Sequence, residues 1–435
     1  MLEFGREVCG DTVAAESREW LVTNGIGGFA MGTLAGPLTR RYHGLLVAAL
    51  KPPLARTLLL AKLDETASYL GKSYPLFSNR WADGTLEPAG FHYLERFHLE
   101  GAIPVWSYAL ADALLEKRIW MEQGVNTTYV HYRLARGSAP LTLAIKALAN
   151  YRDYHHTTAP EAWSMEVTTT ADGLRLQADP ATEPFYLLSQ EAAFKAQEEW
   201  YTDYYLPVEA YRGQDDEVDA HVLAGLLDFD LQPGHSLTVV ASTTAAADLD
   251  GTAALRRRRD YERGLLEQAQ VIRQPGPIQQ LVLAADQFIV RRATDQEADG
   301  RSIIAGYPWF SDWGRDTMIA LSGLTLQTGR LNEAAKILRT FARFVDQGML
   351  PNRFPDLGEA PEYNTVDATL WYFEAIRAYL AARQDNALLV ELFPVLQEIV
   401  EWHRRGTRYN IRMDPGDGLI YAGQTGVQLT WMDAK

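Results

Sequence analysis

Residues 332–347, which read NEAAKILRTFARFVDQ, have apolar residues at the spacing of an α-helix. Apolar side chains recur there at spacings of three and four and form one stripe, made of Ile337, Leu338, Phe341, Phe344 and Val345. The same period predicts further helices over residues 255–270, 278–293, 315–328, 364–383 and 387–407. Gly329 and Gly348 stand where C-terminal caps belong. Helical hairpins in series fit a bundle, a solenoid or a closed α/α toroid, and the period does not separate these three.

Before about residue 250 the apolar residues follow a different period. They alternate over short runs, with Gly, Pro and Asp between the runs, which is typical of antiparallel strands. The clearest runs cover residues 127–134, 141–148, 174–178, 185–188 and 236–243. The change of period predicts a β domain over residues 1–250, a linker helix region over 251–275 and a helical domain over 276–435.

Composition narrows the function classes. The chain has 435 residues, with 41 Lys or Arg against 56 Asp or Glu, so its formal net charge is −15. An acidic chain argues against nucleic acid or an anionic membrane as partner, because both need a basic face. Cys9 is the only cysteine, so no internal disulfide forms, and we expect no metal or other cofactor. Without a signal-peptide pattern or a long apolar segment, we expect the cytoplasm as its location.

Residues 309–316, WFSDWGRD, concentrate aromatic rings and charged groups. Aromatic faces stack on sugar rings, while Arg315, Asp312 and Asp316 can grip neighbouring hydroxyls through charge-assisted hydrogen bonds. The segment therefore suits a sugar pocket. A structural interpretation stays open beside it, in which Asp312 caps a helix, the aromatics are core, and Arg315 pairs with Asp316 at the surface.

Further polar side chains collect in a loop and at the helix start that follows it. Residues 348–356, GMLPNRFPD, are too rich in Pro, Gly and Asn for a helix, and a loop of this kind often lines a site. Counted from Asn364 as a helix cap, Asp367, Trp371 and Glu374 share one helix face. Spacing alone favours a capping role for Asp367, since a catalytic acid at a helix start needs burial or a nearby negative charge to keep its proton.

Several long motifs, in the right order, resemble one known family. Within residues 19–30, 40–47, 60–65, 151–155 and 211–213 the chain reads EWLVTNGIGGFA, RRYHGLLV, LAKLDE, YRDYH and YRG. These resemble the N-terminal domain of bacterial and archaeal glycogen debranching enzymes. Residues 309–316, 350–353 (LPNR), 363–368 (YNTVDA) and 430–435 (TWMDAK) resemble their amylo-α-1,6-glucosidase domain.

The resemblance implies a β-sandwich followed by an (α/α)6 toroid, of which only about the first half is present. It also implies hydrolysis, with inversion, of α-1,6-linked glucose at branches of glycogen, limit dextrin or branched malto-oligosaccharides. Asp367 is then the acid, and Arg315 and Asp316 hold glucose in the terminal subsite, as an Arg-Asp pair does in related glucoamylases. Further sugar contacts are expected from Asp312, Trp313, Asn352, Arg353, Trp371, Trp431 and Asp433.

An inverting hydrolase also needs a base, which this family carries on the last helices of its toroid. We therefore expect the base beyond the end of this chain, and expect the chain alone not to hydrolyse limit dextrin. Two other function classes stay open. An inverting disaccharide phosphorylase of similar architecture uses phosphate in place of the base, and a glucan-binding fragment releases no sugar.

Overall fold

The computed structural model describes residues 2–214, 216–294, 297–355, 360–383 and 386–432. The chain divides into two compact units, which are treated separately below. The β unit comprises Met1–Leu50 and Arg56–Glu262, and the helical unit comprises Lys51–Ala55 and Arg263–Lys435.

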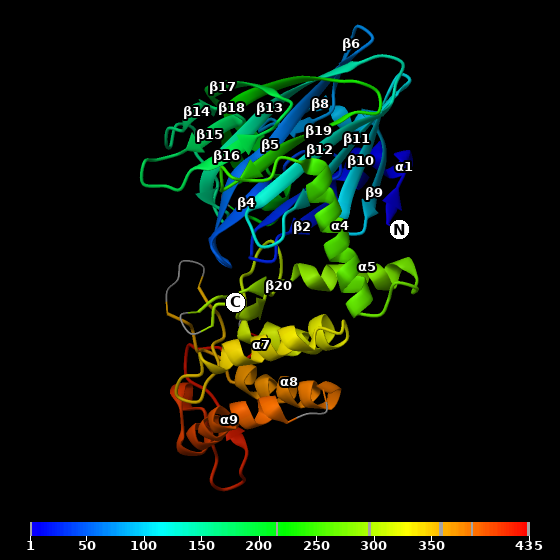
Figure 1. Ribbon diagram of the computed structural model, residues 1–435. Coiled ribbons are helices and arrows are strands. Elements are labelled where there is room, and N and C mark those ends of the chain that lie inside the picture. Colours follow the sequence, from blue (N-terminus) through cyan, green and yellow to red (C-terminus); the bar gives the residue numbers. More distant parts are fainter. Residues whose placement is uncertain (1, 215, 295–296, 356–359, 384–385, 433–435) are drawn as a thin grey trace. The chain divides into compact units, whose positions relative to one another are not determined.

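Two large antiparallel sheets make up the β unit (Figure 1). The first has the order β1 (Glu3–Phe4), β9 (Leu94–Glu100), β10 (Ile103–Leu110), β11 (Ala113–Met121), β12 (Thr127–Arg136), β19 (Ser236–Ser242), β16 (Phe185–Leu188), β15 (Gly173–Gln177), β14 (Glu166–Thr170). The second has the order β17 (Ala193–Tyr205), β18 (Val218–Leu231), β13 (Leu141–Asp153), β5 (Leu54–Tyr69), β4 (Gly44–Lys51), β3 (Phe29–Thr33), β2 (Glu19–Thr23), and β6 (Lys72–Pro75) pairs with β5. The predicted antiparallel β domain is confirmed.

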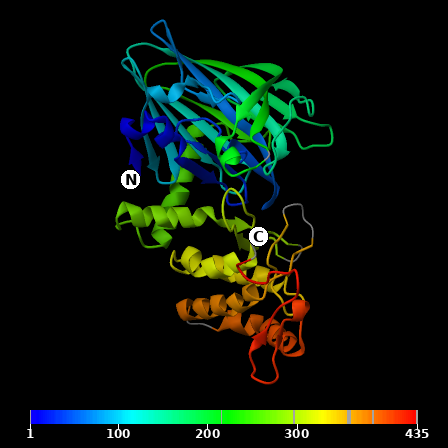
Figure 2. The ribbon, with the colours of Figure 1, turned by 180° about the vertical axis from the view of Figure 1, so that it is seen from behind.

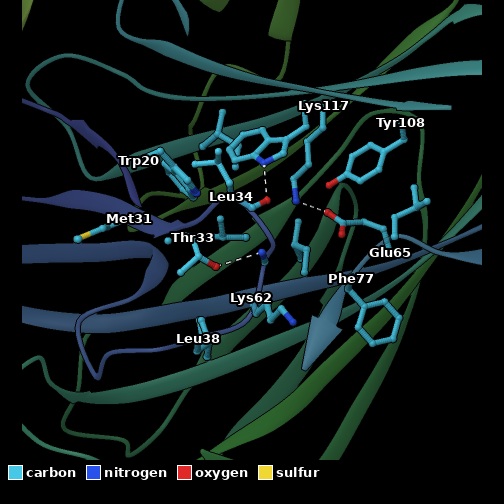
Figure 3. A pocket seen from close by; sticks show the side chains of 18 residues that line it. Trp20, Met31, Thr33, Leu34, Leu38, Lys62, Glu65, Phe77, Tyr108 and Lys117 are labelled. Carbon is cyan, nitrogen blue, oxygen red and sulfur yellow. Dashed lines mark hydrogen bonds and ion pairs between the residues drawn. The ribbon is translucent and has the colours of Figure 1, made fainter. Parts of the chain in front are cut away.

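Apolar side chains of both sheets form one buried core, because alternate residues of each strand point to the same face. Trp106, Lys117 and Tyr132 are cross-strand neighbours on β10, β11 and β12. The Lys117 ammonium lies 5.8 Å from the Trp106 ring and 5.9 Å from the Tyr132 ring, and donates to Glu65 at 2.5 Å. This ion pair borders an inner cavity of about 60 Å³ between the sheets (Figure 3). The charged residues of the LAKLDE segment are thus buried structural groups.

Shorter elements complete the β unit. They are α1 (Arg6–Cys9), α2 (Thr12–Glu16), β7 (Ser78–Arg80), β8 (Leu86–Ala89), the 3₁₀ turn η1 (Gly90–Tyr93), α3 (Pro207–Tyr211) and most of α4 (Gly251–Gln268). Arg257 on α4 pairs with Glu122 at 2.7 Å, which fixes the start of this helix to the β unit.

The helical unit contains α5 (Gly276–Gln287), α6 (Gly314–Leu321), the π-helical segment η2 (Ser322–Leu326), α7 (Leu331–Ala342), α8 (Asp367–Arg383) and α9 (Ala387–Arg405). Short elements lie between and after them: β20 (Ile289–Arg291), β21 (Arg301–Ile303), η3 (Arg408–Asn410), β22 (Arg412–Met413) and β23 (Ile420–Tyr421). The predicted order of helices is confirmed, although two predicted ends are wrong. The run over 278–293 ends as strand β20, and the run over 332–347 leaves the helix after Ala342.

The stripe of α7 explains how the helices pack. Ile337, Leu338 and Phe341 are fully buried in a core shared with α6, α8 and α9. Both views show α7, α8 and α9 lying side by side (Figures 1 and 2). The hydroxyl of Tyr372 on α8 donates to the Leu338 carbonyl at 2.8 Å, which ties α8 to α7.

Among the described residues, no helix is long and apolar enough to cross a membrane.

Candidate active site

The candidate site is built where helices α6 and α8 begin. Gly314 opens α6, and its N–H donates to the Asn352 carbonyl at 2.8 Å. A Cβ at Gly314 would meet the Pro351 carbonyl oxygen at 2.0 Å, so only glycine allows this approach. The loop over 350–353 therefore lies against the first turn of α6.

Asp312 does not take either of the roles that the sequence suggested. The N-cap of α6 is Trp313, with no side-chain capping bond. Asp312 is fully buried, and its two oxygens accept from Arg292 Nε and Nη2, each at 2.5 Å. The Arg292 guanidinium also lies 4.3 Å from the Phe354 ring. Asp312 is therefore a structural carboxylate beneath the site, which corrects its expected sugar contact.

The centre of the site is a cluster of Arg315, Thr365 and Asp367. Arg315 Nε donates to both oxygens of Asp367, at 2.9 and 3.0 Å. Arg315 Nη2 donates to the Thr365 hydroxyl at 3.3 Å, and that hydroxyl donates to Asp367 Oδ1 at 2.6 Å. Arg315 and Thr365 are buried, whereas the Asp367 side chain is 19% exposed. The carboxylate can thus be reached from solvent while its partners hold it in place.

The start of α8 differs from the expected capping arrangement. Asn364 does not cap the helix; its side-chain carbonyl accepts from Asn352 Nδ2 at 3.3 Å. The capping acceptor is Thr365, whose hydroxyl receives the Ala368 N–H at 3.3 Å. The Asp367 carboxylate is engaged by Arg315 and Thr365, so the expected capping role, which begins at Asn364, is wrong.

Other predicted site residues lie around this cluster. Asp316 is exposed on the first turn of α6, where the helix dipole favours negative charge. Trp313 pairs with Arg353 through a β-bridge, and the Arg353 guanidinium lies 5.8 Å from its ring. Arg353 also pairs with Glu362 at 2.7 Å.

Two buried polar atoms near the α6 start have no hydrogen-bond partner in the described part of the chain. They are Asn352 Oδ1 and the Trp313 indole nitrogen. A buried polar group without a partner costs free energy unless water or a ligand satisfies it. Both atoms are enclosed beside the cluster and are not reached by solvent.

The remaining predicted residues differ in their solvent exposure. Trp371 is 40% exposed and stands one turn after Asp367 on α8, and Trp431 is 72% exposed in the C-terminal segment. Glu374 is engaged by Arg377 at 2.5 Å. Asp433 lies outside the described residues. In the described ranges, no group of His, Cys, Asp and Glu is arranged to hold a metal ion.

Sequence reasoning missed Thr365 and Arg292. A threonine two residues before an acid, at a predicted helix start, is a signal that could have indicated Thr365. Nothing in the spacing indicates Arg292, because its contact with Asp312 depends on how β20 packs beside the α6 start.

Comparisons with known proteins give the class first. Residues 283–435 match the family model described as amylo-alpha-1,6-glucosidase, which places the helical region in a glycosidase class. In the sequence this region follows a β-rich domain. Residues 18–238 match the model described as glycogen debranching enzyme N terminal, which is half of the chain. The chain belongs to the glycogen debranching enzyme family.

One curated relative is the glycogen debranching enzyme of Saccharomyces cerevisiae, at 26% identity. The match covers 36% of this chain and only 14% of that protein, so this chain spans a small part of that relative. Among solved structures, a bacterial glucoamylase complexed with acarbose has a TM-score of 0.46 and 11% identity, covering 90% of this chain and 59% of that one. A putative kojibiose phosphorylase from human microbiome has a TM-score of 0.37 and 8% identity, covering 88% and 52%.

Proposed function

We propose that this chain takes part in removing α-1,6-linked glucose from branches of glycogen or limit dextrin, as a cytoplasmic inverting glycosidase. In this proposal residues 1–250 are a β-sandwich, residues 251–275 a linker, and residues 276–435 part of an (α/α)6 toroid. The observation that carries the proposal is the cluster of Arg315, Thr365 and Asp367 inside the region that matches the glucosidase model.

Each site residue has a role that its surroundings allow. Asp367 donates the proton to the glycosidic oxygen, and Arg315 and Asp316 grip glucose hydroxyls. Sugar rings stack on the indoles, and polar contacts come from the loop before α8 and from the C-terminal segment. The proposed stacking and polar residues are Trp313, Trp371, Trp431, Asn352, Arg353 and Asp433.

The pairing of Arg315 with Asp367 has a consequence for the reaction. A guanidinium favours the ionised form of a carboxylate that it contacts, whereas a general acid must carry a proton. Glucose hydroxyls that bind Arg315 compete for its N–H groups and loosen its hold on Asp367. Sugar binding and release of the Asp367 carboxylate from Arg315 are therefore coupled in this proposal.

Inversion also needs a second carboxylate, about 6.5–9.5 Å from the acid, to activate water. Carboxylates around the cluster already have cationic partners: Asp312 has Arg292, Glu362 has Arg353, and Glu374 has Arg377. We propose that none of these three is the base, and we expect the chain alone to bind the branch glucose without releasing it in water.

The experiment uses purified chain and a malto-oligosaccharide that carries one α-1,6-linked glucose. Azide is a small anionic nucleophile that needs no general base. It attacks the anomeric carbon, the glycosidic oxygen leaves with the proton of Asp367, and the product is β-glucosyl azide with inverted configuration. We expect this product from the chain with azide, its loss in Asp367→Asn, and its persistence in Glu391→Gln, an exposed carboxylate paired with Arg339.

Other outcomes contradict parts of the proposal. Glucose release in water, abolished by Asp367→Asn, would show that the base lies within these residues. Glucosyl phosphate formed only with added phosphate would make the protein a phosphorylase. Binding without any product under all three conditions would leave a glucan-binding protein.

A further inference from the structure

A second pocket lies on the β unit and is lined by the segment before β14 and by strands β17 and β18. Its volume is about 330 Å³, within the range usual for small-molecule sites. Buried Met165 and Val222 form its floor, and half-buried Trp163 and Trp200 form its walls.

The two tryptophans are fixed in position and still offer polar atoms. Their ring centroids are 5.0 Å apart with an interplanar angle of 59°, and both rings pack against the core of the β unit. Neither indole N–H of Trp163 or Trp200 donates to a protein acceptor within the described ranges. Two indole donors thus stand beside two partly exposed aromatic faces.

The rim of the pocket supplies acceptors. Glu161, Ser164 and Glu198 are exposed there. Glu198 Oε1 accepts the Val167 N–H at 3.2 Å, which orients its carboxylate toward the pocket rim. Glu161 has a φ of 58°, an unfavourable backbone conformation for a residue other than glycine, and such outliers often occur at binding sites.

This chemistry selects a class of ligand. Two carboxylates on the rim and a formal net charge of −15 exclude an anion. An aromatic cage for an ammonium group needs rings that stand apart around it, and rings 5.0 Å apart leave no room between them. A neutral polyhydroxy ring fits: its apolar face stacks on an indole, and its hydroxyls donate to Glu161 and Glu198.

We propose that the pocket of Trp163 and Trp200 is a second, non-catalytic glucan-binding site. Only the identity of the bound sugar depends on the function proposed above. A site on the β unit would hold one chain of a branched polymer independently of the residues that act on the branch glucose.

The test is electrophoresis of the full chain through gels that contain increasing glycogen, in an Arg315→Ala background that disables the proposed catalytic site. We expect Trp163→Ala and Trp200→Ala each to raise the Kd for glycogen about fivefold to tenfold, as expected for a lost aromatic contact. The matched control is Trp81→Ala, which removes an indole packed on Tyr204 and hydrogen-bonded to Glu87, and we expect its Kd to stay within about twofold of the parent.

Folding is checked by circular dichroism, and the milder variants Trp163→Phe and Glu198→Gln repeat the test without a large cavity. Retardation that survives in Trp163→Ala and Trp200→Ala would overturn the site. Retardation that occurs with the wild type but not with the Arg315→Ala parent would also overturn the site. That result would leave the proposed function unaffected. Displacement of glycogen by trimethylammonium salts but not by maltoheptaose would also overturn the glucan-binding site, in favour of a cation site.

Discussion

At the residue scale, Asp312 and Asp367 show how exposure separates a structural carboxylate from one that can act. Both are paired with arginine, yet Asp312 is completely buried while the Asp367 side chain is 19% exposed. In a buried pair each charge depends on its partner, because water does not reach either group. A partly exposed pair can exchange its partner for a ligand.

Replacing Asp312 by Asn leaves the Arg292 guanidinium buried without a counter-charge. Breaking a buried pair by removing one partner costs about 3–5 kcal/mol, so we expect a large loss of stability in the helical unit. The control is Glu374→Gln, which breaks an exposed pair that solvent screens, so we expect a much smaller loss. Urea unfolding followed by far-ultraviolet circular dichroism measures both, and equal losses would contradict the structural role of Asp312.

Two buried histidines of the β unit predict how stability depends on pH. Burial, followed by the nearby Arg118, lowers the pKa of His131 to about 4. Burial also lowers the pKa of His221 to about 4, against the opposing effect of Asp219. Both pKa values lie below the ordinary value of 6.5. Between these values the two histidines bind protons in the unfolded chain but stay neutral in the folded chain.

Stability should therefore fall as pH decreases from about 6.5 to about 4, by roughly 3 kcal/mol for each histidine. Urea titrations at several pH values measure this slope. We expect His131→Gln to reduce the slope inside that window and to leave it unchanged between pH 7 and pH 8. An identical slope in the variant and the wild type at low pH would contradict the assignment.

At the element scale, α7 shows where a periodic pattern misleads. The apolar stripe continues to Phe344 and Val345, but the helix ends at Ala342 and the chain turns back between Asp346 and Met349. Gln347 and Gly348 both have positive φ, 51° and 70°, as in a tight two-residue turn. Phe344 and Val345 still pack on the helical core from this turn. The pattern predicts burial correctly and the helix end incorrectly, since burial does not require the helix to continue.

Two neighbouring substitutions test this turn. Gly348→Ala adds a Cβ 2.4 Å from the Trp402 Cβ on α9, at a φ of 70° that disfavours alanine, so we expect a loss of more than about 2 kcal/mol. Gln347→Gly relieves a positive φ at an entropic cost of similar size, so we expect a change within about 0.5 kcal/mol. Thermal unfolding compares the two, and a tolerated Gly348→Ala would show that the turn is not held against α9.

At the scale of the whole molecule, some features could be predicted and others could not. The antiparallel β domain and the order of helices follow from local periods, and the family follows from long motifs in a fixed order. The contact between Arg315 and Asp367 joins residues 52 positions apart, and spacing carries no information on it. The same holds for the pairing of Asp312 with Arg292. Such contacts depend on tertiary packing, which decides which polar side chains remain available for chemistry.

The central claim is that the start of α6 and the start of α8 together bind the branch glucose. Calorimetric titration with a malto-oligosaccharide carrying one α-1,6-linked glucose tests it, in a Trp200→Ala background that weakens the pocket on the β unit. We predict saturable binding that Arg315→Ala weakens at least about tenfold, the size of a lost charge-assisted hydrogen bond, while Arg339→Ala, a surface arginine paired with Glu391, leaves it unchanged. Equal affinity in the Arg315→Ala chain and its parent, or no binding to either, would contradict the account.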